Sequence, residues 1–284
     1  MLHELRRRQH DVGHGGSLGH ELLVHDGEEV VAGEAALHEL LLGRDRDRVG
    51  VLDEQRPDRL ALPQLTPQRD QVVDALVALS TDPDRAARVL RLSPRQRGEI
   101  EVNAAVRDGP TMPALDRYTG VLYDALDATS LDAGARRWMA RHVLIRAAVL
   151  GPVGALDRIP AYRLGPHVSL PGVPSLRRLW AGAVTAALAE RGDPFVLDLR
   201  SEAYVALGPL PTSIPAGYVR VVTTGEDGTV RALNHFNKAA KGALVRALAE
   251  QRPAVRSLRA LLRWADRAGV PLEASTAGEV LLRA

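Results

Sequence analysis

Apolar and polar residues alternate with clear helical spacing once the chain passes Pro57. The stretch 68–79 predicts an amphipathic helix. Asp82 followed by Pro83 predicts a capped helix start, and this helix is expected to run through Arg91. Ser93 followed by proline is a second such pair of N-cap and proline, and it predicts the start of a helix that ends near residue 107. The two short helices and their tight turn predict a helix-hairpin-helix-like element, a unit that either contacts DNA phosphates or only packs.

Short apolar runs between the later helices predict strands. The expected strands are 142–149, 195–199, 218–224, 229–236 and 279–283. The expected helices are 175–191, 238–250 and 254–268. Together they predict a mixed α/β (α+β) fold, a single domain in which helices flank a central mixed sheet.

Residues 1–56 have a different character. They show no clear pattern of strands, turns and helices. They carry six of the nine histidines, His3, His10, His14, His20, His25 and His38. Only His10 and His14 stand four residues apart and the other histidines do not follow this spacing, so no helical metal site is expected. The segment is expected to be a poorly ordered extension, and residues 57–284 are expected to form the domain.

Composition narrows the class of protein. Of the 284 residues, 45% are hydrophobic and 25% charged, a mix typical of a globular domain. The chain has no cysteine, which excludes disulfide-linked partners and thiolate metal sites. No run approaches the ~18–20 apolar residues of a membrane span, and no signal peptide is visible. A cytoplasmic protein with no membrane partner and no cofactor is expected.

The net charge of +2 conceals two halves of opposite sign. Residues 1–56 hold 7 arginines against 12 acidic residues, a balance of −5. Residues 57–284 hold 30 basic and 23 acidic residues, a balance of +7. A basic body favours a polyanionic partner.

The strongest candidate site is the segment NHFNKAAKG, which begins at Asn234 and ends at Gly242. It lies where a strand is expected to end and a helix to begin, so backbone N–H groups and the helix dipole favour an anion. Asn237 is a natural N-cap, and Gly242 permits a close backbone approach. Lys238 and Lys241 share one helix face and are the only two lysines beside 35 arginines. A phosphate pocket is predicted, against the alternative of a solvated first turn.

A second candidate follows the buried strand 195–199. Asp198 and Arg200 point to one side of that strand, at the carboxyl end where α/β proteins place ligands. They serve either a site or each other as an ion pair. Ser201 is the expected N-cap of the next helix, and Tyr204 follows on that helix.

Two further segments complete the candidate binding residues. The proline-bounded loop 151–164 carries Tyr162 and Arg163, and such loops often bind ligands. Tyr118 and Thr119 stand ahead of a predicted helix. No P-loop, G-x-G-x-x-G, H-E-x-x-H or EF-hand motif is present, and no metal site is predicted.

Four segments in this order and spacing carry a resemblance to a known family. They are RYTGVLYDAL at 117–126, DRIPAYRL at 157–164, FVLDLRSEAYVAL at 195–207 and NHFNKAAKGALVRALAE at 234–250. From about residue 57 to 284 the chain resembles the YaaA family of peroxide stress proteins. The resemblance implies an α/β fold with a basic cleft, protection against hydrogen peroxide by limiting free intracellular iron, and a proposed binding of DNA.

Carried over residue by residue, the resemblance implies a cleft with a defined set of candidates. These are Asp198, Arg200, Ser201, Tyr204, Asn234, Lys238 and Lys241, with Tyr118, Thr119, Tyr162 and Arg163 around them. Relatives usually open with a short apolar strand that residues 1–56 do not match. The chain is therefore expected to lack that first strand.

Three hypotheses for function stay open. The first is a peroxide-stress protein whose basic cleft binds DNA or a phosphorylated ligand, with Tyr118 or Tyr204 stacking on bases. The second is an enzyme acting on a nucleotide or nucleic-acid base through Lys238 or Lys241, with Asp198 orienting or acting as acid/base. The third is a direct iron binder, for which the domain offers few histidines.

Overall fold

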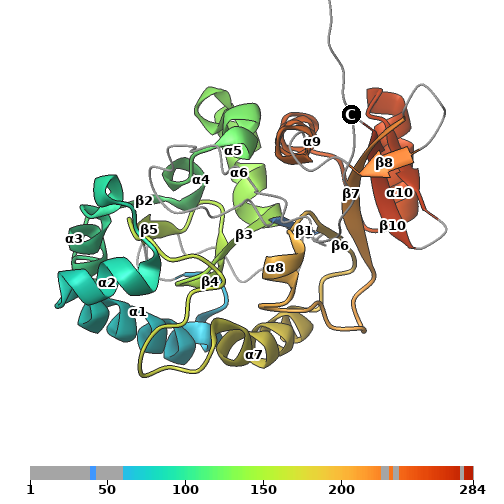
Figure 1. Cartoon of the computed structure of the whole chain (residues 1–284). Coiled ribbons are helices and arrows are strands. Elements are labelled where there is room, and N and C mark those ends of the chain that lie inside the picture. Colours follow the sequence, from blue (N-terminus) through green and yellow to red (C-terminus); the bar gives the residue numbers. More distant parts are fainter. Residues whose placement is uncertain (1–38, 43–59, 225–229, 233–236, 276–277, 284) are drawn as a thin grey trace, which may run out of the picture.

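A mixed β-sheet runs through the middle of the molecule (Figure 1). The computed structural model describes residues 39–42, 60–224, 230–232, 237–275 and 278–283. Within them the strand order is β4-β3-β1-β6-β7-β10-β9, and β8 pairs with β7. The strands are β1 (Glu39–Leu42), β3 (Val143–Ala147), β4 (Gly151–Gly154), β6 (Val196–Asp198), β7 (Ala216–Thr224), β8 (Val230–Ala232), β9 (Leu272–Ala274) and β10 (Glu279–Arg283). A separate two-stranded sheet joins β2 (Thr111–Pro113) to β5 (Arg158–Pro160).

The pairing directions place the candidate chemistry at one point of the sheet. β6, β7 and β10 are parallel, while the remaining pairs are antiparallel. In register, Asp198 of β6 lies opposite Tyr218 of β7, and Tyr218 lies opposite Glu279 of β10. Residues in register across neighbouring strands share one face, so these three form a row across the sheet.

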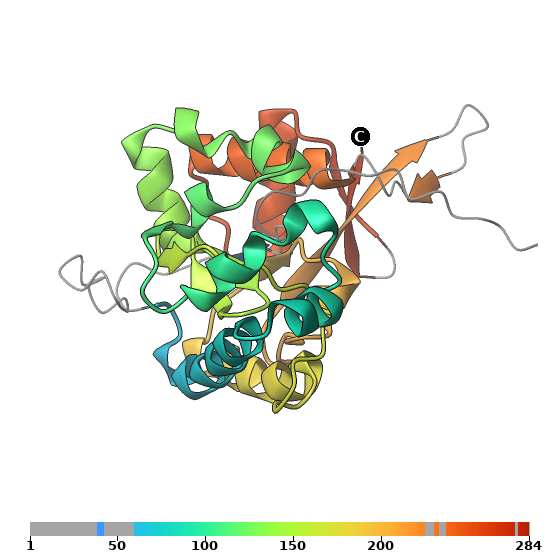
Figure 2. The same cartoon turned by 60° about the vertical axis from the view of Figure 1, so that its left-hand side comes forward.

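Helices cover both sides of the sheet. α1 and α7 lie on one side, and α5, α6 and α9 lie on the other, in both views (Figures 1 and 2). The α-helices are α1 (Thr66–Ser80), α2 (Pro83–Leu90), α3 (Glu99–Ala104), α4 (Ala114–Arg117), α5 (Val121–Leu126), α6 (Ala133–His142), α7 (Leu176–Arg191), α8 (Glu202–Val205), α9 (Asn237–Gln251) and α10 (Leu258–Ala268). Three 3-10 turns, η1 (Pro63–Leu65), η2 (Pro94–Gln96) and η3 (Ala128–Ser130), connect some of them.

The predicted helix starts are confirmed where local capping sets them. The Asp82 side chain accepts a hydrogen bond of 3.0 Å from the backbone N–H of Arg85, and Pro83 opens α2. Ser175 caps α7 in the same way through Arg178. Both caps satisfy an N–H group that a helix leaves unpaired. The predicted mixed α/β class is confirmed, because helices flank the mixed sheet described above.

The helices on either side of Ser93 are present, with one difference. After α2 the chain turns at Arg91, which takes left-handed φ of 55°. η2 then follows a capping box between Ser93 and Gln96, and α3 comes after it. The helix-hairpin-helix assignment of this element stays a prediction.

Two segments differ from the sequence interpretation. Residues 1–56 were expected to lack a strand, whereas β1 pairs with both β3 and β6 inside the sheet. The loop expected at 151–164 contains β4 and β5. Strands of three or four residues carry too little alternation to be recognised, and their partners lie far away in the chain. The domain boundary at residue 57 stays a prediction.

The core continues across the sheet and helices. Trp180 of α7 is completely buried, and its indole N–H donates to the carbonyl of Ala148 at 3.1 Å. A buried indole N–H needs such an acceptor. This bond fixes α7 against the turn between β3 and β4.

Candidate functional site

Asp198 and Arg200 form a buried ion pair where β6 ends. Nε and Nη2 of Arg200 donate to the two carboxylate oxygens of Asp198 at 2.8 and 2.7 Å. The third donor group, Nη1, reaches the carbonyl of Gly208 at 2.6 Å. Arg200 is 0% exposed and Asp198 4%. Of the two alternatives left open, the structure has the pairing of Asp198 with Arg200, so neither charge is directed outward.

Lys241 points toward the same strand end from α9. Its Nζ donates to the carbonyl of Leu199 at 3.0 Å, and the residue is only 5% exposed. Burial lowers the pKa of Lys241 to about 8, Asp198 opposes this shift, and Arg220 adds to it. A buried ammonium loses hydration, which favours the neutral amine. Lys238, one turn earlier, is exposed.

Tyr218 completes this group and was not singled out from the sequence. The Lys241 Nζ and the Arg220 guanidinium carbon each lie 5.7 Å from the centre of its ring. Burial, followed by the charges of Asp198 and Glu202, raises the pKa of its phenol. We call Asp198, Arg200, Tyr218 and Lys241 the lysine site. The available signal was strand alternation, which places Tyr218 on the sheet face opposite to the buried Gly217 and Val219.

Three tyrosines form a second buried group, the tyrosine cluster. The hydroxyls of Tyr118 and Tyr162 are 2.7 Å apart, and burial raises the pKa of both phenols. Tyr204 lies close enough to raise them further. All three are at most 6% exposed. Stacking on a base, the role expected of Tyr118 or Tyr204, would require these buried rings to become exposed.

Arg146 of β3 adjoins both groups as a buried cation. Its Nη1 and Nη2 donate to the carbonyls of Ala147 and Leu207, each at 3.0 Å, and its guanidinium faces Trp180 at 5.2 Å. Burial, reinforced by the charge of Arg200, lowers the pKa of Arg146 to about 9. Carbonyl dipoles and an aromatic ring therefore hold this charge.

The other predicted site residues are spread out. Thr119 and Ser201 are exposed, and Ser201 precedes α8 as its N-cap residue, as predicted. The Arg163 backbone exchanges two hydrogen bonds with the buried Asn103 side chain, at 2.7 and 3.0 Å. Nη1 of Arg163 is buried and has no hydrogen-bond partner in the part of the chain that the structure describes. Asn234 lies outside the described residues.

Asn237 does not cap α9 as expected. It is the first residue of the helix, and its buried Oδ1 has no hydrogen-bond partner among the described residues. An N-cap side chain would accept from an N–H two or three residues on. The anion pocket predicted at this helix start therefore lacks its expected cap.

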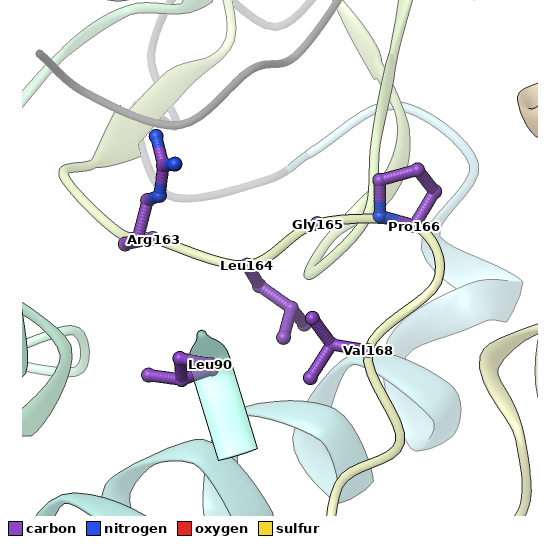
Figure 3. Close-up of a pocket in the computed structure, with 6 residues that line it drawn as sticks. All are labelled: Leu90, Arg163, Leu164, Gly165, Pro166 and Val168. Carbon is purple, nitrogen blue, oxygen red and sulfur yellow. The ribbon is translucent and has the colours of Figure 1, made fainter. Parts of the chain in front are cut away.

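A small pocket of about 90 Å³ lies between the end of α2 and the loop after β5 (Figure 3). Its lining residues are Leu90, Arg163, Leu164, Gly165, Pro166 and Val168. In Figure 3 the Arg163 side chain leaves the loop on the side away from Leu164 and Val168. A space of this size holds a few water molecules and no nucleotide. The pocket shares no residue with the lysine site.

The close approach expected at Gly242 is made to another helix. A Cβ at this position would overlap the carbonyl oxygen of Leu122 and lie 3.0 Å from the Cβ of Ala125, both in α5. The glycine thus allows α5 and α9 to pack backbone to backbone. At this residue the glycine of the motif is explained by helix packing and does not require a ligand.

Gly242→Ala is therefore expected to destabilise the protein by about 1–3 kcal/mol, because the added methyl group overlaps backbone that cannot rotate away. Chemical denaturation measures this loss. Gly182→Ala on α7 is the matched control, since nothing lies within 4 Å of its Cβ position. That variant is expected to keep or gain stability. Equal behaviour of the two variants would contradict this account of Gly242.

The described residues also bear on metal and membrane partners. Among the described residues, no three histidine, aspartate or glutamate side chains gather closely enough to hold a metal ion. Within the same residues, no helix is both long enough and apolar enough to cross a membrane.

Comparisons with known proteins agree on one family. A family model described as "Peroxide stress protein YaaA" matches residues 50–269. A UPF0246 protein of Corynebacterium efficiens is 40% identical over 225 residues, which cover 78% of this chain and 80% of that protein. A UPF0246 protein of Streptomyces coelicolor is 43% identical over 191 residues, covering 66% of this chain and 73% of the relative. A third, from Corynebacterium glutamicum, is 37% identical over 218 residues, covering 75% and 85%.

Proposed function

This chain belongs to the peroxide stress protein YaaA family, and from that membership we propose that it protects the cell during peroxide stress by binding DNA. The resemblance implies that such protection works by limiting the damage that intracellular iron causes. A protein bound to DNA would act where hydroxyl radicals do their harm.

The observation that carries this proposal is a group of arginines around α2 and η2. Arg85, Arg88, Arg91 and Arg95 are exposed and form no ion pair with the part of the chain that the structure describes. Their neighbour Arg97 is paired with Asp84 at 2.6 Å. Unpaired surface arginines on one short element attract phosphates and release counterions on binding. We call these four residues the basic hairpin.

The lysine site supports a different kind of contact. Arg200 and Lys241 direct their donors to Asp198, Gly208 and Leu199, so a bulky duplex would have to break these bonds. Lys238 remains available for a phosphate at the surface. Ser201, Thr119, Tyr162 and Tyr204 stay proposed lining residues of a smaller ligand site.

The triple variant Arg88→Ala/Arg91→Ala/Arg95→Ala is expected to bind duplex DNA at least about tenfold more weakly at 0.1 M salt. Each lost phosphate contact removes about one unit from the slope of log affinity against log salt. Fluorescence anisotropy of a labelled duplex over a salt series measures both quantities. The affinity should fall for every sequence alike, because phosphates carry no base identity.

A matched control uses α10. Arg259, Arg263 and Arg267 are exposed arginines on that helix, and replacing all three by alanine changes the net charge equally. The control should keep nearly all binding. An equal loss of DNA affinity in both variants would mean that overall charge, and not the arginines around α2 and η2, determines binding. A folded wild type that binds no DNA would overturn the proposal.

A second candidate, an enzyme acting on a nucleotide or nucleic acid, is supported by the burial of Lys241. Lysine can lose its proton and attack an electrophile, whereas arginine cannot. Asp198 would act by holding Arg200 and by its charge, because both of its oxygens accept hydrogen bonds from Arg200. The trapping experiment described below tests this candidate.

A further inference from the structure

The two lysines of this chain have different surroundings, although they stand three residues apart in one helix. All 35 other basic residues are arginines. Lys238 is exposed, whereas Lys241 is buried against β6 and β7. The first buried position of α9 thus carries a primary amine, in a chain whose other basic residues apart from Lys238 are arginines. A guanidinium could supply charge and hydrogen bonds there, but not a nucleophile.

Burial and the charge of Arg220 favour the neutral amine of Lys241, whereas the charge of Asp198 favours the ammonium. An ammonium has three donor hydrogens, and among the described residues Nζ has one hydrogen-bond acceptor, the carbonyl of Leu199 at 3.0 Å. The nearby carboxylate of Asp198 is held by Arg200 through both oxygens. With a pKa of about 8, roughly a tenth of the Lys241 side chains would be neutral at pH 7 and half at pH 8.

We propose that Lys241 forms a Schiff base with the aldehyde carbon of a phosphorylated sugar, either free or at an abasic position in DNA. This proposal rests on the second candidate function. Among the groups of a nucleic acid, the open-chain sugar aldehyde is the carbonyl that an amine attacks reversibly. Base loss under oxidative attack produces that group.

The reaction needs no oxidant or cofactor. The lone pair of Nζ forms a bond to the carbonyl carbon, and the carbonyl electron pair moves to oxygen. A proton passes from nitrogen to that oxygen and gives a carbinolamine. A second proton on the hydroxyl lets water leave, the nitrogen lone pair forms the C=N bond, and a protonated imine remains.

The phenol of Tyr218 is the proposed source of that second proton, because the Lys241 Nζ lies over its ring. Its ring centre is 5.7 Å from the Lys241 Nζ, and its raised phenol pKa keeps the proton in place at neutral pH. The Leu199 carbonyl holds Nζ beside it. A phosphate on the substrate would meet Lys238, because residues three apart share a helix face.

The test is reductive trapping on the full chain. The protein is incubated with cyanoborohydride and either 2-deoxyribose 5-phosphate or a duplex with one abasic position, and peptide mass spectrometry locates the adduct. We expect adducts on Lys241 at least about tenfold more abundant than on Lys238. Trapping should rise with pH through about 8, where half of the Lys241 side chains are neutral, and level off about one pH unit higher. Lys241→Arg should remove the adduct while keeping the charge.

Arg259→Lys provides the reference for an ordinary exposed lysine, which should trap no more than Lys238. If Lys241→Arg fails to fold, adduct location and pH profile in the wild type decide alone. Trapping of the free sugar phosphate without DNA binding would support the Schiff base and overturn the DNA proposal. DNA binding without any Lys241 adduct would support the DNA proposal and overturn the Schiff base. Equal labelling of Lys238 and Lys241 would overturn the inference.

Discussion

Asp198→Asn is expected to lower the free energy of unfolding by about 3–5 kcal/mol, the largest effect of a single substitution that the structure predicts. The substitution keeps the side-chain shape and removes the negative charge. Arg200, which is 0% exposed, would then hold an uncompensated charge. Arg146 makes this worse, because the charges of Arg146 and Arg200 are close enough to repel each other.

Denaturation with urea at pH 7 measures the loss, and a double-mutant cycle with Arg200→Gln isolates the pair. The double variant should recover part of the stability, since it buries no unpaired charge. Asp84→Asn, at the exposed pair with Arg97, is the control and should leave the melting temperature nearly unchanged. A loss at Asp198 no larger than at Asp84 would mean that the pair is not buried as described.

The second large effect concerns pH. Wild-type stability is expected to rise by about 2–3 kcal/mol relative to Lys241→Met between pH 7 and pH 10. Burial lowers the pKa of Lys241 from 10.5 to about 8 in the folded chain. Between these values the unfolded chain binds a proton that the folded chain does not, so raising the pH favours folding. Below pH 8 both states are protonated, and the difference becomes constant.

The comparison with Lys241→Met cancels other groups that titrate in this range, including Arg146 and the buried tyrosines. Urea denaturation at half-unit steps of pH gives both curves. Parallel curves would show that Lys241 keeps an ordinary pKa, which would also remove support for its role as a nucleophile.

The candidate site was partly predictable. The sequence pointed to Asp198, Arg200 and Lys241, and the structure brings these residues to the end of β6. It offered the pairing of Asp198 with Arg200 as one of two alternatives, but it did not indicate the hydrogen bond from Arg200 to the carbonyl of Gly208, nor the place of Tyr218. Their roles toward a ligand stay predictions, as does the place of Asn234, outside the described residues.

Local interactions explain what the sequence determined by itself. The starts of α2 and α7 follow from Asp82 and Ser175, whose side chains bond N–H groups three residues on. The apolar stripe of α1 and the strands β6 and β10 follow from periodicity within a few residues. The order and spacing of four segments were also enough to indicate the family.

Only the tertiary structure decided which distant residues contact each other. Lys241 meets the carbonyl of Leu199 across 42 residues of sequence, and Gly242 accommodates a carbonyl of α5. β1 joins the sheet through strands whose positions its own four residues do not encode. A cap or a helical stripe is complete within one or two turns of chain. The environment that lowers the pKa of a lysine forms only when distant elements pack and exclude water around it.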